Sequence, residues 1–266
     1  MEFRWIESPD NWVVRLVRRL QHKKHRDAEG LFLIEGINLL SEALRRGVIP
    51  RIVLIAEDTA LPEEDLRILE EHPAEVYRLS RRLFERISDA GNGVGVIAVV
   101  RLPEYRVQDL PADGNIVVLD RLQDPGNIGT IIRTAVAAEY RAVFALKGTA
   151  DLYSLKVLRA TAGMVFDIPV LRFDTEEEMA EVLRRLGKRL VVTVPVGGIS
   201  YYEADLTDGT ALVIGNEGNG ISASLLERAD LGVTIPLAGG VESLNAAVSA
   251  AILMDESVRG RMTVLK

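Results

Sequence analysis

The chain has 266 residues, 48% of them hydrophobic and 27% charged, a composition typical of one large or two ordinary globular domains with apolar cores. It contains no cysteine, which excludes disulfide bonds, thiolate nucleophiles and cysteine-bound zinc or iron–sulfur centres. The net charge of −7 at pH 7 argues against a protein that coats nucleic acid without discrimination.

The N-terminal part of the chain alternates between predicted helices and short strands. It lacks the apolar core of a signal peptide, and no apolar run of the chain is long enough to span a bilayer, so we expect a cytoplasmic protein with no membrane partner. Ser8 is the predicted N-cap of the first helix, with Pro9 at its first position. The patterns predict helices over 8–24, 36–47 and 62–71 and after Ser80, and strands over 32–34, 51–55, 76–77 and 94–100.

A stretch with little periodicity separates this small α/β domain from the rest. It runs from Arg101 to Asn115 and contains two prolines and a glycine, so we interpret it as a linker between domains 1–106 and 107–266. Beyond it, strands are predicted over 116–120, 142–146, 190–194, 211–214 and 232–235, and helices over 128–138, 154–161, 175–186, 222–228 and 244–258. These strands are nearly continuous apolar runs, which is the pattern of a parallel sheet covered by helices on both faces.

A basic stripe lies in the first predicted helix and just beyond it, without an acidic residue in between. Its members are Arg15, Arg18, Arg19, Lys23, Lys24 and Arg26. For an isolated stripe, the pattern favours a solvated helix face. The alternative is a contact with the phosphates of a nucleic acid, because each Lys or Arg that neutralises a phosphate releases a counterion.

Three strand-to-helix turns of the C-terminal domain combine polar residues with glycine. They are the segments 127–133, 215–220 and 239–245. Together they predict that several loops converge on one ligand-binding site at one edge of the sheet. Each turn by itself is equally consistent with a tight turn of an ordinary α/β fold.

The glycine spacing argues against two common nucleotide motifs, and with them against a nucleotide-dependent oxidoreductase. Gly215, Gly218 and Gly220 are spaced three then two, whereas the dinucleotide fingerprint is spaced two then three. No Gly-Lys-Ser/Thr follows, so the turn is not a phosphate-binding P-loop either.

The C-terminal domain has no histidine, which excludes a Ser–His–Asp hydrolase built within it. No acidic cluster has the spacing of an all-oxygen metal site, so we expect no metal. The remaining polar residues suit anion contacts and group transfer assisted by arginine. They are Asn127, Arg133, Lys156, Arg159, Glu217, Ser243 and Asn245.

Taken together, several segments resemble the SpoU (TrmH-type) family of RNA ribose 2′-O-methyltransferases, within the SPOUT class. The three characteristic motifs of that family are matched by residues 119–135, 212–221 and 235–245, in that order, and residues 153–163 fit a further recurrent segment. Residues 23–36 resemble the RNA substrate-binding domain that many members carry. The resemblance covers nearly the whole chain, and it is the order and combination of the motifs that make it specific.

The resemblance implies a C-terminal parallel-sheet SPOUT domain with a trefoil knot, which sequence physics would not predict. It implies S-adenosylmethionine as cofactor and a homodimer whose active site forms at the subunit interface. The positions that match cofactor contacts are Thr193, Gly215, Asn216, Ile235, Leu237 and Leu244. The apolar C-terminal helix is a candidate for the dimer interface, although core packing explains its pattern equally well.

The resemblance also assigns Arg133 a catalytic role, in activating the ribose 2′-hydroxyl. Because arginine stays protonated in proteins, two interpretations are open: a base in an unusual environment, or a cation that positions a phosphate and stabilises developing alkoxide charge. Asn127, Glu217, Ser243 and Asn245 would orient the substrate and the arginine.

We therefore expect a methyltransferase that acts on the ribose 2′-hydroxyl of RNA. Large-subunit (23S) ribosomal RNA is the expected substrate, because a separate RNA-reading domain suits a folded rRNA site. Transfer RNA is the nearest alternative, and a non-catalytic RNA-binding protein of the same fold is another. In the stripe, the candidate RNA-binding residues are Arg18, Arg19, Lys23, Lys24 and Arg26.

Overall fold

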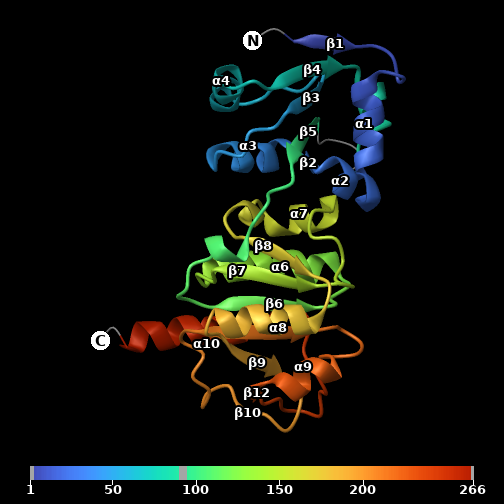
Figure 1. Ribbon diagram of the computed structural model, residues 1–266. Helices are drawn as coiled ribbons and strands as arrows, with labels where there is room; N and C mark the ends of the chain where they lie inside the picture. The colour runs from blue at the N-terminus through green and yellow to red at the C-terminus, as the bar shows by residue number, and fades with distance from the viewer. Residues whose placement is uncertain (1–2, 90–94, 265–266) are drawn as a thin grey trace. The chain divides into compact units, whose positions relative to one another are not determined.

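The computed structural model describes residues 3–89 and 95–264 (Figure 1). The chain forms two compact units. The first comprises the residues up to 104 together with 153–166, and the second comprises 105–152 and 167–266. The functional boundary near residue 106 stays a prediction. The segment 153–166, which we placed in the C-terminal domain, belongs to the first compact unit.

The first unit is a five-stranded mixed sheet flanked by helices. Its strand order is β1-β4-β3-β5-β2, with β5 antiparallel to both neighbours and the other pairs parallel. The strands are β1 (Arg4–Ile6), β2 (Leu31–Glu35), β3 (Ile52–Ala56), β4 (Glu75–Leu79) and β5 (Val96–Arg101). The helices are α1 (Trp12–Leu20), α2 (Lys23–Glu29), α3 (Ile37–Arg45), α4 (Glu63–Glu71), α5 (Arg81–Glu85) and α7 (Leu155–Thr161), with a 3₁₀ turn at Met164–Phe166.

The predicted first helix over 8–24 is wrong in its start and its length. The side chain of Asn11, and not that of Ser8, caps α1 by accepting a hydrogen bond from the Val13 main-chain N–H at 2.9 Å. Ser8 instead accepts from Asp10, in the turn before the helix. The chain leaves the helical path after Leu20 and starts a second helix at Lys23, so the stripe spans two helices.

The other predicted elements of this unit are present, and the predicted cap at Ser80 is confirmed by a hydrogen bond from the Leu83 main-chain N–H. Residue 94, at the start of the predicted strand 94–100, lies outside the described residues. Strand β1 was not predicted, because a strand of three residues is too short to show an alternating pattern. Buried valines of α1 pack on the alternate residues of β2, β3 and β5 that face them, which forms the core of the unit.

The second unit is a seven-stranded sheet with the order β10-β12-β9-β11-β6-β7-β8, and every pair is parallel, as predicted. The strands are β6 (Ile116–Asp120), β7 (Ala142–Leu146), β8 (Val170–Phe173), β9 (Arg189–Thr193), β10 (Ile199–Ser200), β11 (Thr210–Gly215) and β12 (Leu231–Thr234). The sequence patterns did not reveal the edge strands β8 and β10, which are short.

Helices cover both faces of this sheet. They are α6 (Pro125–Ala137), α8 (Glu176–Arg185), α9 (Ala223–Arg228) and α10 (Ala246–Val264), and a 3₁₀ turn at Val107–Asp109 precedes β6. Apolar residues of α8 and α9 pack with alternate residues of β6, β7, β9 and β11, whereas α10 packs against α6 and β11. Among the described residues, no helix combines the length and the apolarity that a bilayer crossing requires.

Candidate functional site

The strand order of the second unit brings the three polar–glycine turns to one edge of the sheet. From β6 the chain builds outward through β7 and β8, whereas β11, β9 and β12 lie on the other side of β6. The order therefore reverses between β6 and β11, and ligands of open parallel sheets bind at such a switch point, beyond the carboxyl ends of the strands. Asp120 and Gly215, the last residues of β6 and β11, are partners in the strand register.

A chain of side-chain hydrogen bonds joins the three turns. The Asn127 amide donates to Oε1 of Glu217 at 3.0 Å, and the Asn245 amide donates to Oδ1 of Asn127 at 2.9 Å. Asn127 is only 8% exposed, and these two hydrogen bonds satisfy both the nitrogen and the oxygen of its amide within the protein. Three of the five predicted catalytic residues therefore lie in one connected network.

Glu217 also fixes the loop that enters α6. Its carboxylate accepts hydrogen bonds from the main-chain N–H groups of Gln123 and Asp124, both at 3.1 Å. Desolvation alone would raise the pKa of Glu217, but the hydrogen bonds from Asn127 and from main-chain N–H groups outweigh it and lower the pKa below its ordinary value. The carboxylate thus acts as a negatively charged clasp between the turn after β11 and the start of α6.

Asp120, the last residue of β6, stabilises the same edge of the sheet, although its role was not predicted from the sequence. Its fully buried carboxylate accepts a hydrogen bond from the Ser222 main-chain N–H at 2.7 Å and pairs with Arg121 at 2.9 Å. Arg121 adopts a positive φ of 58°, and its carbonyl accepts from the Asn216 amide at 2.7 Å. An acidic residue that ends an otherwise apolar strand was the available signal.

Steric crowding within the turn itself requires glycine at position 215. A Cβ there would lie 2.6 Å from the carbonyl carbon of Gly220 and 2.7 Å from the nitrogen of Ile221. Oδ1 of Asn216 accepts from the main-chain N–H groups of Gly218 and Asn219, which closes the turn. Both residues were predicted to bind the cofactor, a role that stays a prediction, and the structure gives each of them a part in shaping the turn.

Arg133 and Ser243 lie outside this network. Arg133 is exposed on α6, somewhat under two helical turns beyond Asn127, and Ser243 is exposed in the loop before α10. Among the described residues, neither side chain has a hydrogen-bond or ion-pair partner. The guanidinium group of Arg133 is therefore available to an anionic ligand.

The loop over 235–244 presents both main-chain polar groups and an exposed apolar side chain to a ligand. None of its main-chain N–H or C=O groups is hydrogen-bonded to another described residue, and Leu237 is 38% exposed. Main-chain polar groups of this kind need partners, which solvent or a ligand supplies. Thr193 is the last residue of β9, and Ile235 directly follows the neighbouring strand β12. Apolar side chains beside unpaired main-chain groups suit a ligand with a flat apolar ring and polar edges.

The structure corrects the predicted role of Arg26 in the N-terminal stripe. Its side chain is buried, with 6% exposure, and donates hydrogen bonds to the carbonyls of Leu20 and Gln21 at 2.6 and 2.7 Å. The charge thus satisfies the C-terminal end of α1 and does not face a ligand. Its spacing within the stripe could not distinguish this inward position from an exposed one.

The other predicted RNA-binding residues of the stripe are at least partly exposed. Arg19 forms an ion pair with Glu29, and Lys23 approaches Asp27 at 3.8 Å. Arg18 and Lys24 have no partner among the described residues. Of the stripe, Arg18 on α1 and Lys24 on α2 therefore combine at least partial exposure with unpaired charge, as does Arg15, which is exposed on α1.

Comparison with known proteins gives matches over both units. The sequence pattern of the SpoU rRNA Methylase family matches residues 114–255, and that of the MRM3-like substrate binding domain matches residues 11–98. The chain is 39% identical over 249 residues to the 23S rRNA (guanosine(2553)-2'-O)-methyltransferase RlmP of Bacillus subtilis, which covers 94% of this chain and 97% of the relative.

Two further matches extend over most of the chain. A 23S rRNA (uridine(2479)-2'-O)-methyltransferase of Streptomyces viridochromogenes is 30% identical over 252 residues, covering 92% of this chain and 88% of the relative. The crystal structure of an AdoMet-bound rRNA methyltransferase from Sinorhizobium meliloti superposes with a TM-score of 0.87 at 31% identity, covering 97% of this chain and 98% of the other.

Proposed function

The chain belongs to the SpoU rRNA methylase family, and from this premise we propose that it is an S-adenosylmethionine-dependent methyltransferase that acts on a ribose 2′-hydroxyl of 23S ribosomal RNA. The observation that carries the proposal is the Asn127–Glu217–Asn245 network, which holds the three family motifs together at the edge of the sheet. The extensive identity to two 23S rRNA 2′-O-methyltransferases supports the substrate.

The loops that follow β9, β11 and β12 would hold the cofactor. Thr193, Gly215, Asn216, Ile235, Leu237 and Leu244 are the residues that we propose to hold it. S-adenosylmethionine supplies an electrophilic methyl group when bound. Unpaired main-chain groups of residues 235–244 would recognise its polar groups, and the side chains of Ile235, Leu237 and Leu244 would bind its apolar part.

Arg133 is the catalytic residue of this proposal. Its exposed guanidinium group has no protein partner among the described residues, so it is free to bind a phosphate beside the target ribose. As a protonated group it would also stabilise the negative charge that develops on the 2′-oxygen while the oxygen–methyl bond forms, the sulfur–methyl bond of the donor breaks and the hydroxyl proton passes to solvent water. This assignment favours electrostatic stabilisation over a role as base.

The remaining predicted residues orient this arrangement. Asn127, Glu217 and Asn245 are positioning residues, because their side-chain atoms are engaged with one another and with the loop before α6. Alignment of the acceptor oxygen with the methyl donor dominates an in-line transfer, and a fixed loop supplies that alignment. Ser243, exposed in the loop before α10, is free to contact the substrate.

We further propose a homodimer in the cytoplasm, a trefoil knot in the C-terminal domain and a reaction without a metal ion. Val248 is an exposed apolar residue near the start of α10, and such exposure is consistent with an interface between two copies. Light scattering tests the dimer: we expect twice the chain mass of 29.3 kDa, and a monomer at micromolar concentration contradicts it.

Methyl transfer from radiolabelled S-adenosylmethionine tests the function. We expect label in a protein-free 23S rRNA transcript and not in total transfer RNA, and we expect one ribose to become resistant to alkaline cleavage, because a 2′-O-methyl group blocks that reaction. Label confined to transfer RNA favours the alternative substrate. If the protein binds RNA in the absence of cofactor and transfers no label to any RNA, it is a non-catalytic RNA-binding protein.

A further inference from the structure

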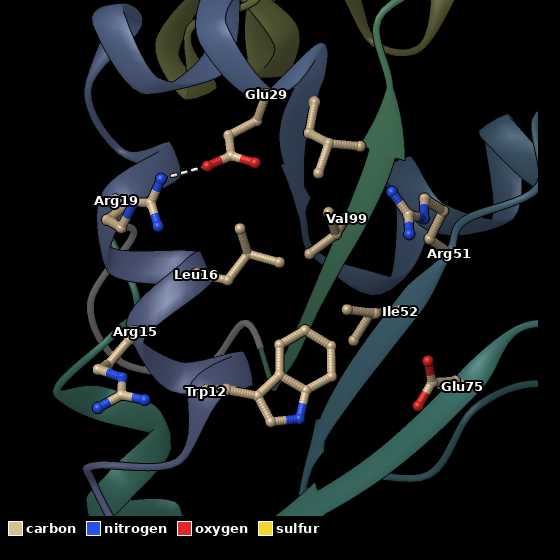
Figure 2. A pocket seen from close by; sticks show the side chains of 10 residues that line it. Trp12, Arg15, Leu16, Arg19, Glu29, Arg51, Ile52, Glu75 and Val99 are labelled. Carbon is tan, nitrogen blue, oxygen red and sulfur yellow. Dashed lines mark hydrogen bonds and ion pairs between the residues drawn. The ribbon is translucent and has the colours of Figure 1, made fainter.

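A cavity of about 360 Å³ opens in the first unit, between α1 and the ends of its central strands (Figure 2). Its floor is apolar and consists of Leu16, Leu31, Ile52 and Val99. The volume lies within the range of small-ligand sites, roughly 300–1,000 Å³. None of the turns of the candidate active site contributes to its lining.

Trp12 presents an aromatic side chain to this cavity. It is the first residue of α1 and is 51% exposed, and Figure 2 shows its indole beside Ile52. The cap at Asn11 fixes the start of the helix, so Trp12 stands on a rigid element. Its neighbours at helical spacing, Arg15 and Leu16, line the same cavity. A half-exposed indole on an apolar floor is a surface on which a planar base can stack.

The charges around the cavity favour an anion. Arg15 and Arg51 have no partner among the described residues, and Figure 2 shows their guanidinium groups on opposite sides of the cavity. Both acidic lining residues are already neutralised. Glu29 pairs with Arg19, and Glu75 accepts from Arg4 at 2.8 Å and from the Tyr77 hydroxyl at 2.6 Å. Two free cations thus flank an apolar and aromatic site.

We propose that this cavity binds one unpaired nucleotide of the substrate RNA, a proposal that rests on the proposed RNA methyltransferase function. The base stacks on Trp12 and covers Leu16 and Ile52, while Arg15 and Arg51 bind the adjoining phosphates. An unpaired nucleotide fits better than a duplex, because only a base outside the helical stack exposes its face to an aromatic side chain. The site extends RNA contact beyond Arg18 and Lys24 of the basic stripe.

Tryptophan fluorescence of the full-length protein gives a direct readout. The chain has two tryptophans, so Trp5→Phe leaves Trp12 as the only indole. We expect a short unstructured oligoribonucleotide to quench this fluorescence and a duplex of the same sequence to leave it unchanged. Equal quenching by both, or none by either, overturns the proposal.

Binding of a protein-free 23S rRNA transcript tests the individual residues. Trp12→Ala is expected to weaken binding roughly 5- to 100-fold, Trp12→Phe to restore most of the loss, and Arg15→Ala and Arg51→Ala to lower the salt dependence. Arg67→Ala is the matched control, because Arg67 is an exposed and unpaired arginine of the same unit outside the cavity. A loss for Trp12→Ala no larger than that of this control overturns the proposal.

Two more measurements separate this proposal from its alternatives. Methyl transfer by Trp12→Ala should show a raised KM for RNA with an unchanged kcat. If the wild-type protein transfers methyl groups and Trp12→Ala changes neither RNA binding nor the KM for RNA, only the cavity proposal fails. If the wild-type protein transfers no methyl group at all, the proposed function itself fails. A defect of Trp12→Ala on intact large subunits but not on protein-free RNA would assign the cavity to a ribosomal protein and overturn the RNA site.

Discussion

The amide of Asn245 donates a hydrogen bond to Oδ1 of Asn127 at 2.9 Å, although the two residues are 118 positions apart in the chain. Oδ1 of Asn245 meanwhile accepts from the main-chain N–H groups of Ala247 and Val248, so this one side chain both caps α10 and reaches α6. The cap of the last helix is thereby tied to the first turn of the site.

This relationship predicts strong coupling between the two asparagines. Asn127→Ala and Asn245→Ala should each lower kcat/KM, and the double variant should lose less than the product of the two single losses, with a coupling energy of about 0.5–3 kcal/mol. A double-mutant cycle on methyl transfer measures this. A coupling energy below about 0.3 kcal/mol would show that the two side chains act independently.

The clasp formed by Glu217 predicts a specific dependence of stability on pH. Because hydrogen bonds lower its folded-state pKa below 4.5, its contribution to stability is present above about pH 4.5 and is lost as the pH falls through the lowered value. At pH 7 we expect Glu217→Gln to destabilise the protein by on the order of 1 kcal/mol, a modest value because the carboxylate is partly exposed to solvent.

Denaturant unfolding at two pH values checks this expectation. The difference between the wild-type protein and Glu217→Gln should be largest at pH 7 and should shrink well below pH 4.5. A difference that is the same at both pH values would mean that the charge of Glu217 does not hold the loop before α6.

The turn after β11 allows a comparison between two glycines. Gly215→Ala places a Cβ within 2.7 Å of main-chain atoms, so the turn must shift and we expect a loss of about 1–3 kcal/mol together with weaker cofactor binding. Gly218→Ala is the matched control, because its Cβ would lie 3.6 Å from Oδ1 of Asn216, an ordinary contact. Thermal unfolding and calorimetry with S-adenosylmethionine measure both effects. Equal tolerance of the two alanines would contradict the crowding seen at Gly215.

The corrected basic stripe separates binding residues from a structural one. Arg18→Ala and Lys24→Ala should weaken RNA binding for all sequences, and each should reduce the slope of log K against log salt by roughly 0.7–0.9. Arg26→Ala should mainly reduce stability, by about 1–3 kcal/mol, because it leaves the carbonyls at the end of α1 without their buried donor. Filter binding over a salt series and thermal unfolding distinguish the two kinds of effect. If neither Arg18→Ala nor Lys24→Ala changes the slope of log K against log salt, the stripe is a solvated helix face without RNA contacts.

The long, periodic elements could be predicted from the sequence, and so could the parallel sheet of the second unit. The predicted strand at 116–120 and the predicted helix at 128–138 appear as β6 and α6 because local periodicity determines them. Short edge strands such as β10 carry too little pattern. The sequence predicts Ser8 as the cap of α1 because Pro9 follows it, whereas in the structure the side chain of Asn11 caps the helix by accepting from the Val13 main-chain N–H.

The site was only partly predictable for a related reason. The residue types of Asn127, Glu217 and Asn245 marked them as polar groups in glycine-rich turns, and the strand order then brought them into contact. The buried position of Arg26 and the support from Asp120 depend on tertiary contacts that residue spacing does not record. Trp12 likewise carries no signal in the sequence beyond its type.

The central claim is that the three turns hold a methyl donor beside Arg133, and single-turnover transfer by Arg133→Ala tests it most directly. With cofactor affinity measured by calorimetry in parallel, we predict that transfer into 23S rRNA falls by about 10²–10³ while S-adenosylmethionine still binds, and that Arg184→Ala, an exposed arginine on α8, leaves the rate unchanged. Transfer by Arg133→Ala at the wild-type rate would contradict the claim.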